Sequence, residues 1–209
     1  MALAKDIQDV FDAMVVPPNG DQSAAENAKT DDWMCGELSK VIVNYFKSAT
    51  IMATATVAGG VPAGTFAAGT GSASGWTIQD IKAQLLAGCN AKEDSAIANA
   101  WGSAIESAGM AATCDFATIA GTVTTPVGVT SPLAGPAKGT VAGAASGSCG
   151  PAFLAAFNGA KNVSSGGDGI IAAGMAAAIT SFVASMQCLV TGNGPIAGAV
   201  GTGITTPGA

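Results

Sequence analysis

The sequence predicts an α+β fold that is mainly helical and consists of three internal repeats, residues 1–75, 76–147 and 148–209. Each repeat is expected to hold a helix, a polar loop, a longer helix, a short strand and a Gly/Pro-rich extended arm. Three observations predict this organisation. Short segments recur in the same order, apolar residues recur at helical spacing, and a stretch rich in Gly and Pro follows each helical pattern.

Recurring segments are the basis of the repeat prediction. Val43–Gly59 aligns without gaps on Ile105–Gly121, and both runs end in Thr-(Val or Ile)-Ala-Gly. Ile7–Val10 (IQDV) returns as Ile78–Ile81 (IQDI). Self-similarity of a Gly-, Ala- and Thr-rich composition is the alternative explanation, but the shared order of the segments favours triplication. Three like units in one chain can close into a pseudo-threefold ring.

The first helix of each unit is predicted from an apolar stripe. In the first unit Ile7, Val10, Phe11 and Met14 fall on one helical face, and a Pro-Pro pair at 17–18 ends the helix. A capping-box pattern opens the helix of the second unit and a glycine closes it, while a proline stands at the start of the third. The residues concerned are Thr77, Ile78, Asp80, Ile81, Leu85 and Gly88, then Pro151, Phe153 and Phe157.

The second helix of each unit is longer and follows residue types that cap helix N-termini. Its stripe of Met, Ile, Leu and aromatic residues is interpreted as the core face of a helical hairpin rather than as a cofactor-binding box. The stripes are Met34, Leu38, Val41, Ile42 and Tyr45; Ile97, Trp101 and Ile105; and Ile171, Met175, Ile179, Phe182 and Met186. The expected caps are Asp31, Asp32, Asp94, Ser95, Ser165 and Asp168.

A short strand and an extended arm are predicted to close each unit. The strands are expected where Thr and Val recur, at 54–57, 118–125 and 189–191. The Gly- and Pro-rich arms cannot be helical, so their backbone groups need a partner on a neighbouring unit or another protein. We predict that the arms are assembly sites, with Val61, Pro62, Gly64, Phe66, Gly69 and Gly71 in the first, Pro132, Gly135, Pro136, Lys138, Gly139 and Gly143 in the second, and Pro195, Gly198, Gly201, Gly203 and Pro207 in the third.

Composition excludes several classes of function. The chain holds 8 Lys, no Arg and no His against 14 acidic residues, a formal net charge of −6. Without His there is no Ser-His-Asp or Cys-His relay and no imidazole metal ligand. Without Arg there is no bidentate phosphate clamp, and an acidic chain is a poor partner for nucleic acid. We therefore expect no catalytic residue, no metal, no cofactor and no nucleic-acid partner.

Motifs that could carry chemistry are interpreted as structural. Gly71–Gly75 (GSASG) and Gly147–Gly150 (GSCG) resemble nucleophile elbows, but no activating base lies near them in sequence. The acidic pairs at 31–32 and 93–94 can bind a divalent cation, although such pairs before a helix more often oppose its dipole. Five cysteines, at 35, 89, 114, 149 and 188, form no CxxC pair and are expected to be reduced thiols.

Two segments bear on location. Residues 1–9 form a charged helix start and not a secretory signal, so synthesis in the cytoplasm without a signal peptide is expected. No charge follows Asp168, and Ile170–Val190 has the length of a membrane span. The segment is rich in Ala, Gly, Ser and Met and lacks basic flanks, so contact with a membrane is disfavoured.

The chain begins Met-Ala-Leu-Ala-Lys-Asp-Ile-Gln, contains Thr/Val strands after Ala-rich helices and ends in Gly-Thr-Gly-Ile-Thr-Thr-Pro-Gly at 201–208. In these features it resembles the small uncharacterised virion proteins of contractile-tailed phages. The resemblance implies an accessory structural role in a tail, baseplate or capsid, or in a related contractile injection machine. It implies a place in a virion or extracellular particle and supplies no catalytic residue.

The predicted function is therefore that of a non-enzymatic assembly protein. It would act by burying uncharged Ala/Gly-rich surface and its arms against other structural subunits, in a homo- or hetero-assembly. One alternative is a small membrane protein with a span near 170–190. The other is a His-free hydrolase or ligand-binding enzyme with a carboxylate centre or a centre at Cys149.

Overall fold

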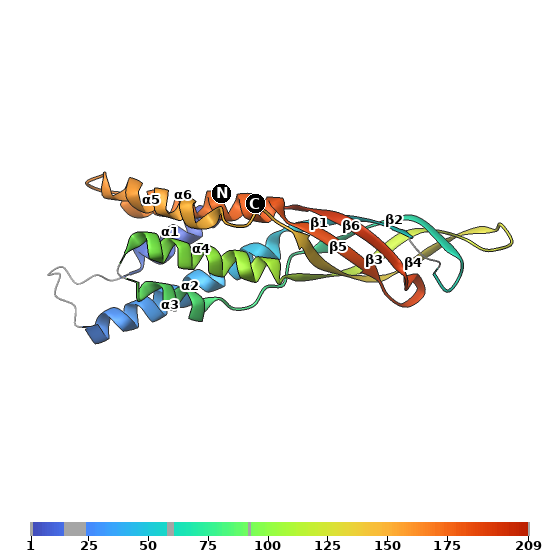
Figure 1. Cartoon of the computed structure of the whole chain (residues 1–209), viewed down its shortest axis with the longest axis horizontal. Coiled ribbons are helices and arrows are strands. Elements are labelled where there is room, and N and C mark those ends of the chain that lie inside the picture. The colour runs from blue at the N-terminus through green and yellow to red at the C-terminus, as the bar shows by residue number, and fades with distance from the viewer. Residues whose placement is uncertain (1, 15–23, 58–60, 92, 209) are drawn as a thin grey trace.

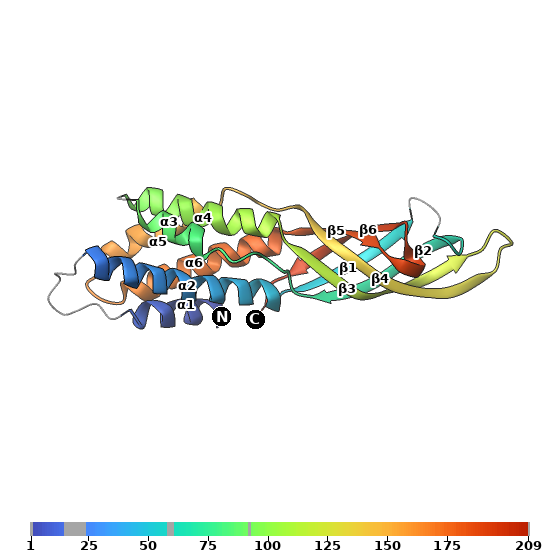
Figure 2. The same cartoon turned by 90° about the horizontal axis from the view of Figure 1, so that it is seen from below.

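The protein is elongated, with a bundle of helices at one end and a β-barrel at the other (Figures 1 and 2). The computed structural model describes residues 2–14, 24–57, 61–91 and 93–208. Both ends of the described chain lie where the bundle meets the barrel (Figure 1). The two ends of the molecule therefore present separate surfaces.

Two helices are followed by two strands three times along the chain. In the bundle each helix packs mainly against its neighbours in the ring α1–α2–α3–α4–α5–α6–α1. The elements are α1 (Ala2–Asp12), α2 (Ala24–Ser48), β1 (Thr50–Val57), β2 (Thr65–Ser74), α3 (Lys82–Cys89), α4 (Asp94–Met110), β3 (Thr113–Thr124), β4 (Thr130–Gly143), α5 (Cys149–Lys161), α6 (Gly167–Ser185), β5 (Gln187–Gly192), the short 3₁₀ helix η1 (Gly194–Ile196) and β6 (Ala199–Thr206).

Six antiparallel strands close the barrel in the order in which they occur in the chain. Closure depends on β6, which pairs with β1 from Thr50↔Thr206 to Val57↔Ala199. The prediction of a mainly helical fold with extended arms is therefore wrong. The Gly- and Pro-rich segments form barrel strands, and their backbone groups find partners within the same chain.

Barrel strands alternate between small inward residues and outward threonines. The inward positions hold mostly Ala, Gly and Cys, with a few larger side chains, because six strands enclose a narrow interior. Phe66 and Phe116 fill much of it, and both are buried. A Cβ at Gly69 or Gly121 would lie 2.5 or 2.8 Å from the ring of Phe66. Such an interior gives little hydropathy contrast along a strand, so the sequence did not predict these strands as buried elements.

The β3–β4 hairpin extends past the rest of the barrel (Figure 2). Strand β4 pairs with β5 only from Ala137 onward, so its first half pairs with β3 alone. Pro132 and Pro136, which have no backbone N–H, lie in this first half. This placement agrees with the general restriction of proline to strand edges.

The sequence match between residues 7–10 and 78–81 has no structural counterpart. Ile7–Val10 lies inside α1, whereas Ile78–Ile81 precedes α3 and is not helical. Thr77 forms a β-bridge with Thr113, and the N–H of Ile81 donates to Ser39 Oγ at 3.1 Å. These contacts hold the segment outside the helix, so the prediction of three copies of one helix-loop-helix-strand-arm unit is wrong in that form.

The predicted helical stripes do face the core, because most of their residues are buried. Helix α6 is, within the described part of the chain, the one helix long and apolar enough to cross a membrane. It packs against α1 and α5, and 39% of its most apolar window is buried. Its inward residues include Met175, Ile179 and Phe182.

Gly139 on β4 provides a test of barrel packing. A Cβ there would overlap the sulfur of Cys114 and lie 2.5 Å from the sulfur of Cys188. We expect Gly139→Ala to lower the free energy of unfolding by about 1–3 kcal/mol, measured by urea denaturation.

Gly143 on the same strand is the matched control, since a Cβ there meets no atom within 4 Å. Gly143→Ala should change stability by less than about 0.5 kcal/mol. Adding Cys188→Ala to Gly139→Ala should restore part of the loss. Equal effects of the two glycine substitutions would contradict the packing described for this layer.

Candidate functional site

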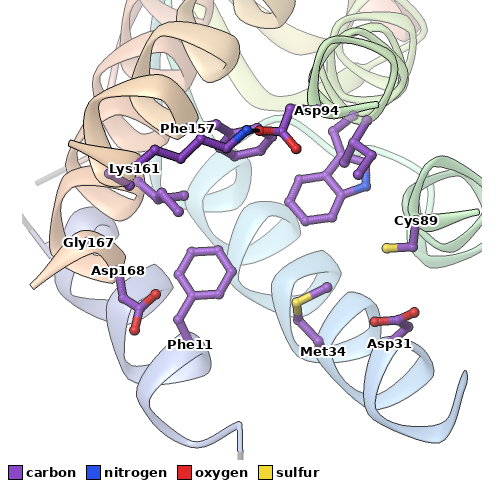
Figure 3. Close-up of a pocket in the computed structure, with 13 residues that line it drawn as sticks. Phe11, Asp31, Met34, Cys89, Asp94, Phe157, Lys161, Gly167 and Asp168 are labelled. Atoms are coloured by element: carbon purple, nitrogen blue, oxygen red, sulfur yellow. Dashed lines mark ion pairs between the residues drawn. The ribbon is translucent and has the colours of Figure 1, made fainter. Parts of the chain in front are cut away.

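A cavity of about 490 Å³ opens at the end of the helical bundle remote from the barrel (Figure 3). All six helices contribute lining residues, which lie at the C-terminal ends of α1, α3 and α5 and in the N-terminal halves of α2, α4 and α6. The lining is mainly apolar, with four charged side chains. The residues are Phe11, Asp31, Met34, Cys89, Asp94, Ile97, Trp101, Phe157, Ala160, Lys161, Gly167, Asp168 and Ile171.

Aromatic side chains form much of the wall, and hydrogen bonding and packing fix two of them. Trp101 is 4% exposed, and its indole N–H donates to the carbonyl of Leu85 at 2.8 Å. Phe157 meets Trp101 edge-to-face, with ring centroids 6.1 Å apart and an interplanar angle of 86°. Phe11, from the end of α1, lies beside Asp168 and lines the same cavity (Figure 3). The wall thus comes from helices far apart in sequence.

Carboxylates surround the cavity on several sides. Asp94 of α4 forms an ion pair with Lys161 of α5. Asp168 lies beside Phe11, and Asp31 lies across the cavity near Met34 (Figure 3). In the part of the chain that the structure describes, Asp31 and Asp168 have no ion-pair or hydrogen-bond partner. Three carboxylates against one ammonium make the cavity acidic.

Cys89 brings a thiol to the cavity. Its sulfur lies 3.4 Å from that of buried Cys35 on α2. The hydrogen bond with Cys35 lowers the pKa of Cys89 and raises that of Cys35, because the pair shares one donor. The structure contains both as free thiols, as expected from the sequence. Cys89, which is half-buried, is the more accessible of the two.

A second thiol pair lies inside the barrel. Cys114 on β3 and Cys188 on β5 are buried, with sulfurs 3.8 Å apart on either side of Gly139. The hydrogen bond between them raises the pKa of Cys114 and lowers that of Cys188. Neither reaches solvent, so this pair packs the barrel.

The GSCG motif at 147–150 is the start of α5 and not a nucleophile elbow. Glu106, 7% exposed on α4, accepts backbone N–H groups of Gly147 at 2.5 Å, Ser148 at 2.9 Å and Cys149 at 2.8 Å. Burial, with the nearby Glu106 charge, raises the pKa of Cys149 to about 12. Its thiol is therefore protonated near neutral pH, and the carboxylate acts as a cap for the helix.

Other predicted caps and motifs have varied positions. Asp31 and Asp32 lie inside α2, because that helix begins at Ala24, and Asp32 pairs with Lys82 at 2.8 Å. Asp94 and Asp168 lie in the first turns of α4 and α6. GSASG at 71–75 ends β2. Among the described residues no group of three or more His, Cys, Asp or Glu side chains is placed to hold a metal ion.

The predicted assembly arms are strands and turns of the barrel. Val61 and Gly64 form a β-bridge in the turn before β2, and Pro195 lies in η1. The remaining residues are distributed over three strands and their flanks: Pro62 in the same turn; Phe66, Gly69 and Gly71 in β2; Pro132, Gly135, Pro136, Lys138, Gly139 and Gly143 in β4; and Gly198, Gly201, Gly203 and Pro207 in or beside β6.

Sequence reasoning missed the cavity because each of its apolar residues fits a core stripe. Phe11, Trp101 and Phe157 all belong to predicted stripes, and the cavity arises only from the joint arrangement of the six helices that line it. One sequence feature pointed to the cavity: Asp31, Asp94 and Asp168 lie in the N-terminal parts of α2, α4 and α6, and all three line it. Comparison with protein-family models, with curated proteins and with solved structures gives no match to this chain.

Glu106 offers a stability test. We expect Glu106→Ala to lower the free energy of unfolding by about 2–4 kcal/mol, since three backbone N–H groups lose a charged acceptor. The exposed Glu93, whose side chain forms no cap hydrogen bond, is the control, and Glu93→Ala should cost less than about 0.5 kcal/mol. If thermal or urea unfolding shows that the two variants lose similar amounts of stability, the capping role of Glu106 is refuted.

Thiol reactivity gives a pH-dependent test. Native protein treated with iodoacetamide should be modified first at Cys89, and faster at about pH 9 than at about pH 7 because more thiolate is present. Cys149 should stay unmodified over this range, since its raised pKa keeps it protonated and it is buried. Mass spectrometry of digests measures both. Early labelling of Cys149 would contradict the described environment.

Proposed function

We propose that this protein is a non-enzymatic structural protein whose barrel is buried against other protein subunits of a larger particle. The resemblance to virion proteins of contractile-tailed phages makes a tail, baseplate or capsid the proposed setting. The observation that carries the proposal is the distribution of charge. Of 8 Lys and 14 acidic residues, only Lys138 and Asp115 lie in segments 50–75, 111–147 and 186–209, which form the barrel.

The barrel is electrically neutral as a result. Asp115 and Lys138 are cross-strand partners on β3 and β4, so their charges offset each other. The rest of the sequence holds the other 7 Lys and 13 acidic residues, and 7 − 13 gives the whole net charge of −6. Solvent-facing surfaces normally intersperse charges of both signs. A barrel with two charges is better suited to contact with other protein.

Apolar side chains are exposed on one face of this neutral barrel. Met52 on β1 is 52% exposed and lies directly opposite Ile204 on β6, which is 69% exposed. Leu189 on β5 and Val200 on β6 are also exposed, and their strands are paired. We call these four residues the β5–β6–β1 patch. Threonines 54, 191 and 202 lie around it, so burial would remove apolar groups and hydroxyls from water but no charge.

The protruding β3–β4 hairpin adds a second contact surface. Its tip carries Val127 and Val129, which are 83% and 58% exposed. The adjoining half of β4 has one side without a partner strand, but Pro132 and Pro136 limit the pairing of another strand there. Side-chain contact at the tip is therefore favoured over strand addition. The proposed mechanism is burial of barrel faces, which replaces the free arms expected from the sequence.

Ile204→Lys tests the proposal. The lysine would place a charge within the β5–β6–β1 patch, at its most exposed apolar side chain, where burial would strip the water from the charge. We expect association, or incorporation into the native particle, to fall at least about tenfold while the variant stays folded. Sedimentation velocity across a wide concentration range and quantitative mass spectrometry of purified particles measure the two quantities.

Ile170→Lys is the matched control, because Ile170 is an exposed isoleucine on α6, away from the barrel. It should leave association unchanged. A wild-type chain that is monomeric at all concentrations and absent from any particle would refute the proposal. So would equal effects of the two lysine substitutions.

A further inference from the structure

We propose that the cavity at the remote end of the bundle binds a small organic cation with an apolar body, such as an aromatic or alkyl ammonium compound. The inference is independent of the proposed assembly role, since helix residues line the cavity and the helical bundle and the barrel form opposite ends of the molecule (Figure 1). Its volume of about 490 Å³ lies within the range of small-molecule sites.

Charge selects the sign of the ligand. Lys161, the one basic residue of the lining among the described residues, is already paired with Asp94. Asp31 and Asp168 are left with no partner among the described residues, one on each side of the cavity (Figure 3). A bound cation would face both carboxylates, whereas an anion would be repelled by them.

Geometry selects an organic cation over a metal ion. Metal sites need several oxygen ligands at one point. The carboxylates of this cavity are spread around an apolar space, and the described residues include no cluster suited to a metal. An organic cation suits this arrangement. Its apolar part can fill the space between the carboxylates, and its ammonium group can face them.

The aromatic wall adds to the attraction. The faces of Trp and Phe rings attract cations, most strongly where water is excluded. Trp101 and Phe157 are held at fixed angles by the hydrogen bond to Leu85 and by their edge-to-face contact. Phe11 provides a third ring on the Asp168 side (Figure 3). A rigid wall reduces the ordering cost of binding.

Calorimetric titration with three probes of one ring size tests the proposal. The probes are benzyltrimethylammonium, neutral benzyl alcohol and anionic phenylacetate, each titrated into the full chain at low ionic strength. We expect the cation to bind at least about tenfold more tightly than the alcohol, and phenylacetate not to bind measurably. Affinities that do not follow this order would overturn the proposal.

Variants locate the site. Replacing both Asp31 and Asp168 by Asn should weaken binding of the cation at least about tenfold and leave benzyl alcohol unchanged. Asp32→Asn removes the same type of charge next in sequence, but from an ion pair with Lys82 outside the cavity lining, and should change binding less than about twofold. An equal effect of Asp32→Asn would overturn the proposal.

A cavity-filling variant separates this site from nonspecific attraction to an acidic protein. Ala160 lines the cavity and is half-buried at the end of α5. Ala160→Phe should abolish binding of the ammonium probe while the thermal midpoint stays close to wild type. Retained binding in a folded Ala160→Phe variant would overturn the proposal. If that variant unfolds, Ile171→Phe provides the same test from α6.

Discussion

Closure of a narrow six-stranded barrel is the constraint on which the rest of the structure depends. Pairing of β6 with β1 leaves no free edge along β1, and it confines the interior to small side chains around Phe66 and Phe116. Gly139 is one of the positions where no Cβ fits. This accounts for a composition with 29 Gly and 49% hydrophobic but only 5% aromatic residues. The composition thus reflects a thin barrel interior, in which closely approaching backbones replace large side chains.

The same constraint explains how charge is divided between the two ends. The inward positions of the strands hold small side chains, so polar groups can stand only at the outward positions. Here the outward positions hold mostly Thr, Ser and Ala. A hydroxyl is far less costly to remove from water than a carboxylate or ammonium. The barrel can therefore be covered by another protein at little electrostatic cost, while the charged bundle stays in solvent. Asp115 and Lys138, facing each other across β3 and β4, do not alter this.

The sequence predicted the helices better than the sheet, for physical reasons. Residues of helical stripes such as Ile7, Val10 and Leu38 contrast strongly with their polar neighbours and are buried as expected. Inward Ala and Gly give almost no such contrast, and the β1–β6 pairing joins segments from distant parts of the chain. Pro132 and Pro136 suggested free arms, yet they occupy the half of β4 that pairs with β3 alone. The cavity was not predicted, because the spacing of apolar residues along each helix cannot show where six packed helices leave a space between them.

Asp31 separates a ligand-binding role for the acidic cavity from a purely structural one. Asp94 and Asp168 lie in the first turns of α4 and α6, where a carboxylate is stabilised by the helix dipole whether or not anything binds. Asp31 lies in the second turn of α2 and has no such role, and its neighbour Asp32 is the residue that forms an ion pair. Among the described residues Asp31 has no ion-pair or hydrogen-bond partner, and it lines the cavity near Met34 (Figure 3). Its position is explained if a positively charged group occupies the space in front of it.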